Sequence, residues 1–136
     1  HIKGSTVENI QLNSFMVTPL ICYDLRFPEA FRLAITKGTD IFIIIACWPQ
    51  SRIEHWRTLL QARAIENQSY VIGVNSVGRE PNMKYGGRSL IIDPTGKVVA
   101  DGGEVESVIE GVIEKKIIDS LRKEFPVLKD IRTDLS

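Results

Sequence analysis

The sequence predicts an α/β fold in which a mixed sheet carries its helices mainly on one face. From residue 15 to residue 75, short apolar runs that suit strands alternate with longer amphipathic segments that suit helices. The strand-like runs are almost continuously apolar, which is typical of parallel strands that are covered on both faces. Pro94-Thr95-Gly96 then separates two short apolar segments, as in a hairpin, so antiparallel strands are expected as well.

Six segments have the composition of strands: residues 15–22, 40–47, 70–75, 89–93, 97–100 and 105–113. Pro19 lies inside the first of them and cannot donate a backbone hydrogen bond, which favours an edge position or a bulge. The last segment alternates between apolar and other residues, as a strand with one covered face does. Residues 76–88 are rich in glycine, proline, asparagine and arginine and are expected to form a loop.

Three segments have the pattern of helices: residues 28–37, 51–68 and 115–125. Pro28 and Glu29 suit the first turn of a helix, and Gly38 suits its end. Ser51 and Glu54 have the spacing of a capping box at the start of the second helix. Consecutive crossovers of one hand place the first two helices on the same face, so only the third remains for the other face. We therefore expect an incomplete covering layer, to be completed by another segment or another subunit.

The composition limits the function. The chain has 136 residues, enough for a single domain, and its 17 basic and 17 acidic side chains cancel, which does not favour binding to nucleic acid or to an anionic membrane surface. The longest apolar run, residues 41–48, is too short to span a bilayer. Two cysteines do not form a disulfide framework, so a cytoplasmic location is expected. The chain opens on His1 rather than methionine, which suggests a fragment or a processed product.

Cys22 is the main candidate for chemistry, because it stands at the end of an apolar strand and just before a charged turn. Open α/β sheets bind ligands at the carboxyl ends of their strands, where a thiol can be exposed and activated by neighbouring charge. The backbone N–H groups of Tyr23 and Asp24 could stabilise the thiolate or an oxyanion. The alternative is that Cys22 is a small buried apolar residue.

Two other residues near the thiol have competing interpretations. Arg26 could add positive potential, but pairing with Asp24 or Glu29 to brace the turn is the favoured role. His55 is the only internal histidine, and a Cys22–His55 dyad is conceivable. The favoured interpretation is a partly exposed histidine near the start of a helix.

Three residues are expected at the same edge of the sheet. Trp48 and Pro49 follow the second strand and could form a pocket wall, although Trp48 is equally well explained as core. Asn75 ends the third strand, and its amide could orient a loop or a ligand. Cys47 is expected to be a small buried residue rather than a second nucleophile.

Polar residues on the second predicted helix have a more conservative interpretation. Arg63, Glu66 and Asn67 lie about one turn apart, as in an intrahelical or turn-bracing cluster. Cysteine and histidine residues lack the short spacings of metal ligands, so no metal is expected.

The segment Leu20-Ile21-Cys22-Tyr23-Asp24-Leu25-Arg26-Phe27-Pro28-Glu29 resembles the nitrilase, or carbon–nitrogen hydrolase, superfamily around its nucleophile. The resemblance continues in order through Trp48-Pro49, His55-Trp56, Ala62-Arg63-Ala64-Ile65-Glu66-Asn67, Gly73-Val74-Asn75 and Ile91-Ile92-Asp93-Pro94-x-Gly96. The sequence pattern from Trp48 through Arg52 to Asn67 is most similar to that of the omega-amidase branch.

This resemblance implies an α-β-β-α sandwich, of which residues 1–136 form a single partial domain, the C-terminal half. It implies hydrolysis of omega-amides of dicarboxylic or 2-oxo acids through a thioester on Cys22, with the N–H of Tyr23 as oxyanion donor, no cofactor and a homo-oligomer. The remaining implied site residues are substrate-binding Trp48, Pro49, Arg52, His55 and Asn75, and supporting Asp24, Arg26, Glu29, Arg63 and Glu66.

The family's glutamate base and its lysine normally lie well upstream of the cysteine, but only 21 residues precede Cys22 here. Lys3 and Glu8 match neither position. We therefore expect these two groups to come from a missing N-terminal half or a complementary chain. The alternative is a non-catalytic fragment or interaction module that retains the fold.

Overall fold

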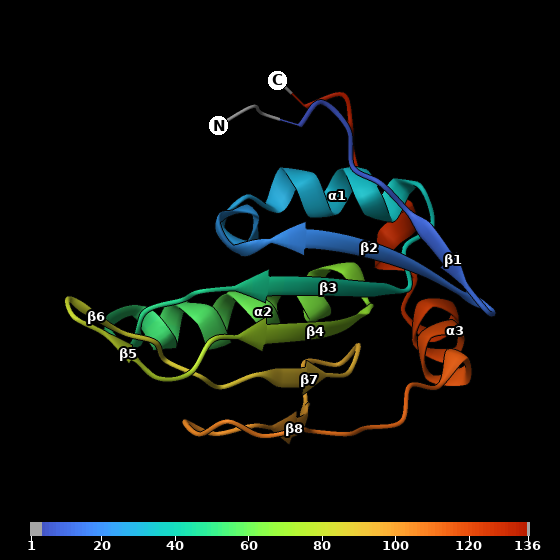
Figure 1. Ribbon diagram of the computed structural model, residues 1–136. Coiled ribbons are helices and arrows are strands. Elements are labelled where there is room, and N and C mark those ends of the chain that lie inside the picture. Colours follow the sequence, from blue (N-terminus) through green and yellow to red (C-terminus); the bar gives the residue numbers. More distant parts are fainter. Residues whose placement is uncertain (1–3, 136) are drawn as a thin grey trace.

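The computed structural model describes residues 4–135, which contain a mixed six-stranded sheet in the order β1-β2-β3-β4-β7-β8 (Figure 1). Strands β2, β3 and β4 are parallel, and the other neighbouring pairs are antiparallel. The six strands are β1 (Ile10–Leu12), β2 (Phe15–Ile21), β3 (Ile41–Ala46), β4 (Tyr70–Asn75), β7 (Leu90–Ile92) and β8 (Val98–Asp101). The predicted α/β fold with a mixed sheet is confirmed.

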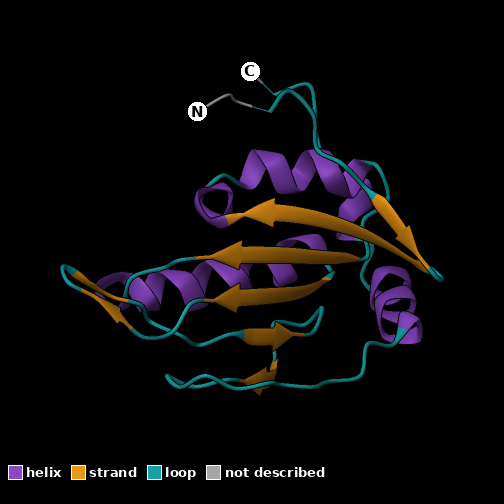
Figure 2. Ribbon diagram, viewed as in Figure 1, coloured by secondary structure: helices purple, strands orange, loops and turns teal. Residues whose placement is uncertain are grey.

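The helices divide unequally between the two faces of the sheet. Figure 2 shows α1 and α2 running along the sheet, while α3 lies apart, near the amino ends of the parallel strands. Within residues 4–135, no helix is both long enough and apolar enough to cross a membrane. The helices are α1 (Pro28–Thr36), α2 (Ile53–Asn67) and α3 (Lys115–Glu124), and the 3₁₀ turns are η1 (Cys22–Arg26), η2 (Gln50–Arg52) and η3 (Val127–Asp130).

Three of the expected elements differ in the structure. Residues 105–113 form no strand, because no described strand pairs with them, and the side chains of Val105 and Val108 project into solvent. Ser51 lies in η2 and does not cap a helix, since α2 begins only at Ile53. Residues 76–88 contain a two-stranded hairpin of β5 (Arg79–Glu80) and β6 (Met83–Lys84) where a loop was expected, and β1 was not predicted.

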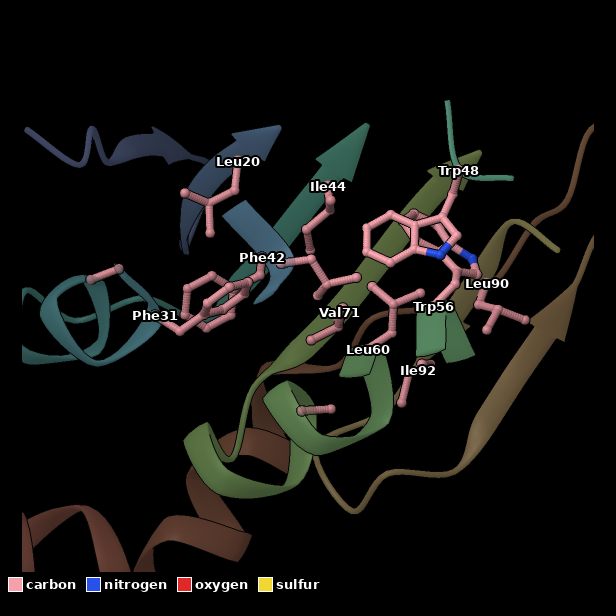
Figure 3. Packing of buried hydrophobic residues seen from close by; sticks show 13 residues of the cluster. Leu20, Phe31, Phe42, Ile44, Trp48, Trp56, Leu60, Val71, Leu90 and Ile92 are labelled. Carbon is pink, nitrogen blue, oxygen red and sulfur yellow. The ribbon is translucent and has the colours of Figure 1, made fainter. Parts of the chain in front are cut away.

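The main core fills the space between the sheet and the pair α1 and α2 (Figure 3). Apolar side chains of β2, β3, β4 and β7 meet Phe31 of α1 and Trp56 and Leu60 of α2 there. Gly73 allows the close approach of α2, because a Cβ atom at this position would lie 2.6 Å from Leu60 Cδ1. The apolar side chains that the parallel strands direct toward this face are therefore buried.

The opposite face of the sheet is only partly covered. Ile118 of α3 packs on Val17, Ile41 and Tyr70, near the amino ends of the parallel strands. Toward the carboxyl ends, apolar side chains of all three strands stay exposed: Ile21 at 63%, Ile45 at 53% and Val74 at 48%. The expectation of an incomplete covering layer is confirmed for the described residues.

Pro19 lies on an open edge of β2. Strand β1 pairs only with residues 15–17 of β2, so its hydrogen bonds end before Pro19. On the other side Pro19 stands opposite Ile43 in the parallel register with β3. The expected edge position is confirmed, and a residue without an N–H group is tolerated there.

Helix α3 is anchored through Asp40, a nearly fully buried carboxylate just before β3. Asp40 accepts a hydrogen bond from the N–H of Met16 at 2.8 Å and faces Lys115 Nζ at 2.7 Å and Arg122 Nη1 at 3.5 Å. Burial lowers the pKa of Arg122 from its ordinary value, and the charge of Asp40 opposes this effect. Arg122 also donates to the carbonyl oxygen of Thr39, which ties the helix to the start of the strand.

We predict that Asp40→Asn lowers the free energy of unfolding by about 2 kcal/mol, because it leaves two partly buried cations without their carboxylate. Urea denaturation measures this change. Asp130→Asn is the matched control, since Asp130 is exposed and takes part in no ion pair within the described residues. Equal stability of both variants would contradict the anchoring role.

Candidate active site

Cys22 follows β2 directly and begins the turn η1. Its φ of 42° lies in the left-handed region, which a residue with a Cβ atom rarely adopts. Such a conformation costs on the order of 1–3 kcal/mol and persists only where the surroundings enforce it. The strand and this turn together present a partly exposed thiol at the carboxyl edge of the parallel strands.

Helix α2 braces this turn from the protein interior. Arg63, which is 5% exposed, donates to the carbonyl oxygen of Leu25 from Nη2 at 2.8 Å and from Nε at 3.2 Å. Glu66 accepts from Arg63 Nη1 at 3.0 Å and balances its charge. At the start of the turn, the carboxylate of Asp24 accepts from the N–H of Ile21 at 2.9 Å. The backbone on both sides of the thiol is thereby fixed.

A cavity of about 380 Å³ opens beside the thiol. Trp48 is a buried wall of this cavity, and its indole donates to the carbonyl oxygen of Arg52 at 2.8 Å. The guanidinium carbon of Arg26 lies 4.7 Å from the centre of the Trp48 ring. The lining thus combines two thiols, an aromatic wall and two guanidinium groups. Its residues are Cys22, Tyr23, Arg26, Cys47, Trp48, Pro49, Arg52 and Met83.

Arg26 does not brace the turn through a carboxylate, contrary to the favoured interpretation. Within residues 4–135 it forms no ion pair with Asp24 or Glu29. Asp24 is taken by the backbone of Ile21, and Glu29 is exposed on α1. Arg26 turns instead toward Trp48 and places Nη2 3.4 Å from Nδ1 of His55. His55 therefore lies behind Arg26, outside the cavity lining, rather than beside the thiol.

Asn75 organises the loops around the cavity without lining it. Its Oδ1 accepts from the N–H of Trp48 at 2.6 Å, and its Nδ2 donates to the carbonyl oxygens of Trp48 at 3.2 Å and Gly87 at 2.8 Å. These bonds occupy the amide with backbone groups and join the turn after β3 to the loop after β4. The side chain orients loops, one of the two roles considered for it.

Two residues of the cavity were misjudged or missed in the sequence. Cys47 was expected to be buried but is exposed on the cavity, with Sγ 3.2 Å from the hydroxyl of Ser76. Met83 comes from the β5–β6 hairpin and had no assigned role. The sequence holds one local indication of a role for Met83: it is an apolar residue in a polar, glycine-containing loop, where its side chain needs a packing partner.

In the described part of the chain, no group of three or more histidine, cysteine or carboxylate side chains is placed to bind a metal ion.

The first residues of a helix carry N–H groups without intrahelical partners, and Tyr23 occupies such a position in η1. Tyr23 and Cys22 are neighbours on the lining of the same cavity.

Comparison with known proteins agrees with this geometry. The model of the carbon-nitrogen hydrolase family matches residues 3–123. A 2-oxoglutaramate amidase of Bacillus subtilis is 44% identical over 97% of this chain and 51% of its own length. A second, from Paenarthrobacter nicotinovorans, is 45% identical over 84% of this chain and 39% of its own.

Solved structures give the same result. A CN-hydrolase superfamily protein of Xanthomonas campestris, solved with an arsenic adduct in its active site, superimposes with a TM-score of 0.91 and 31% identity. It is matched over all of this chain and 54% of its own. The chain thus spans about half the length of the relatives that it matches. Sequence and fold agree, and the chain belongs to the carbon–nitrogen hydrolase family.

Proposed function

We propose that this chain supplies the nucleophile and part of the pocket of an amidase that releases ammonia from a small non-peptide amide. The observation that carries the proposal is the thiol of Cys22, held in a strained turn on a cavity with an aromatic wall. The 2-oxoglutaramate amidases among the relatives support an omega-amide of a dicarboxylic or 2-oxo acid as the substrate.

The proposed reaction has two stages. A general base takes the thiol proton, and Cys22 Sγ attacks the amide carbon, while the N–H of Tyr23 stabilises the oxyanion. The tetrahedral adduct then breaks its C–N bond, and the nitrogen leaves as ammonia with the proton that the base held. Water attacks the resulting thioester, the C–S bond breaks, and the carboxylic acid and the free thiol are formed.

The general base and a stabilising cation come from outside the described residues in this proposal. Among residues 4–135, the lining of the thiol's cavity contains no carboxylate and no lysine. Lys3 lies outside the described residues, and the carboxylate of Glu8 accepts from the hydroxyl of Thr6. The family resemblance implies a catalytic triad of glutamate, lysine and cysteine. Its glutamate and its lysine belong to the N-terminal half of the domain.

The exposed sheet face supports this origin of the two groups. Ile21, the residue immediately before the thiol, is 63% exposed on that face, and Ile45 and Val74 extend the apolar surface across β3 and β4. A layer that buries these side chains ends beside Cys22. Since the relatives are about twice as long as the matched region, we infer that the N-terminal half of the domain forms this layer.

The charge of the cavity favours an anionic substrate. Arg26 and Arg52 both line it, and neither forms an ion pair within the described residues. A guanidinium group binds a carboxylate through two parallel hydrogen bonds. His55 and Trp48 already hold Arg26, so we assign the carboxylate of the substrate to Arg52.

The competing proposal is a non-catalytic interaction module, which the exposed apolar face also favours. Turnover distinguishes the two. An amidase releases ammonia from omega-amides when the covering half is present, whereas a module binds that half without turnover.

We predict that Cys22→Ala lowers ammonia release by the full gene product more than about a thousandfold, since no acyl-enzyme can form. A coupled ammonia assay on 2-oxoglutaramate or succinamate measures the loss. Cys47→Ala, which removes the other thiol of the same cavity, should retain measurable turnover. Undiminished turnover in Cys22→Ala would remove the assignment of the nucleophile.

We also predict that Arg52→Gln lowers kcat/KM for anionic omega-amides by about ten- to a hundredfold, the range for a lost hydrogen bond to a charged group. Neutral amides of the same length should be little affected, because they lack the carboxylate. Arg57→Gln, at an exposed position on α2 a few residues further along the chain, is the matched control. An equal loss for neutral and anionic amides would refute carboxylate binding by Arg52.

A further inference from the structure

The β5–β6 hairpin projects beyond the carboxyl ends of the parallel strands, on the side of the sheet edge that carries the thiol (Figure 1). Its base is fixed to the neighbouring turn. Gly86 N–H donates to the carbonyl oxygen of Trp48 at 2.9 Å, Tyr85 forms a β-bridge with Pro49, and Tyr85 N–H donates to the carbonyl oxygen of Gly78 at 3.0 Å. The hairpin is thereby positioned relative to the aromatic wall of the cavity.

The hairpin and the turn η2 flank a second, open cavity of about 500 Å³ next to the first. The two cavities share the lining residues Pro49, Arg52 and Met83, which therefore form the boundary between them. Of these three, Met83 alone comes from the hairpin. The other lining residues of this outer cavity are polar: Gln50, Ser51, Asn82 and Lys84.

We propose that Met83 determines how long an acyl chain the thiol's cavity accepts, because its side chain separates that cavity from the polar outer one. The inference rests on the amidase function proposed above. Met83 is 41% exposed, unbranched and apolar, so it can contact the methylene groups of a substrate without rigid packing. A short acyl chain ends against it, and a longer chain must displace it to reach the outer cavity.

The inner cavity has an aromatic wall and the outer cavity is mostly polar, so acyl chains of different length meet different surroundings on either side of Met83. A chain that stops within the inner cavity contacts Trp48 and places its carboxylate near Arg52. A chain one or two methylenes longer carries its carboxylate past Met83, toward Lys84 in the outer cavity. One methylene more or fewer in a hydrophobic pocket changes kcat/KM by about tenfold or more. Removal of the side chain joins the two volumes and relaxes this limit.

The test measures kcat/KM for ammonia release by the full gene product with malonamate, succinamate, glutaramate and adipamate. We expect Met83→Ala to raise the adipamate-to-succinamate ratio about tenfold, and Met83→Trp to lower it. Met83→Leu, which keeps an apolar side chain of similar volume, should preserve the ratio of the unmodified protein. Met16→Ala on β2 is the matched control for loss of a methionine, and its ratio should not change.

The outcomes separate this inference from the function on which it rests. If the unmodified protein releases no ammonia from any of the four amides, the proposed function fails. If it is active but the ratio is unchanged in both Met83→Ala and Met83→Trp, Met83 does not set the chain length. A uniform loss with all four amides in every Met83 variant would likewise overturn the inference, since it indicates a structural role.

Discussion

The pair of hydrogen bonds from Arg63 to the carbonyl oxygen of Leu25 is the interaction on which the site depends. It joins the buried face of α2 to the turn that carries Cys22, and Glu66 balances the charge. Burial of a guanidinium group is costly unless both its charge and its N–H groups have partners. The helix that carries Arg63 and the turn that carries Leu25 therefore constrain each other. This constraint explains how a thiol keeps a positive φ at the end of a strand. The placement of Cys22 thus depends on a residue more than 30 positions away in the chain.

A second network gives the cavity its walls. The amide of Asn75 binds the backbone of Trp48 and of Gly87, so the turns that follow β3 and β4 are fixed to each other. Trp48 then supports Arg26, and the loop that Asn75 holds carries the β5–β6 hairpin with Met83. The buried Trp48 and the exposed Met83 of the hairpin thus line the same cavity. In the proposed function, the fixed wall binds the reacting amide and the hairpin selects the length of the acyl chain.

The two faces of the sheet have different roles. One face is covered by α1 and α2 and supplies a buried core, to which the helices contribute Phe31, Trp56 and Leu60 (Figure 3). Among residues 4–135, the other face is covered only near the amino ends of the strands, by α3, which Asp40 holds in place. The uncovered part of the second face adjoins the thiol, so completion of the fold and completion of the active site are the same event in the proposed function.

The sequence by itself determined the order of the main strands and helices, the placement of Cys22 at a strand end and the incomplete second face, because apolar periodicity and turn residues are local signals. For Pro19 it left an edge position or a bulge open, and the pairing of β1 decided for the edge. The tertiary structure decided what depends on partners distant in the chain. Residues 105–113 alternate like a strand but have no described neighbour to pair with. Arg26 stacks on Trp48 rather than pairing with Asp24 or Glu29, which are closer to it in the sequence. The role of Met83 became visible only once the hairpin and the turn at Pro49 were placed side by side, since a cavity is a property of packing between segments and not of either sequence alone.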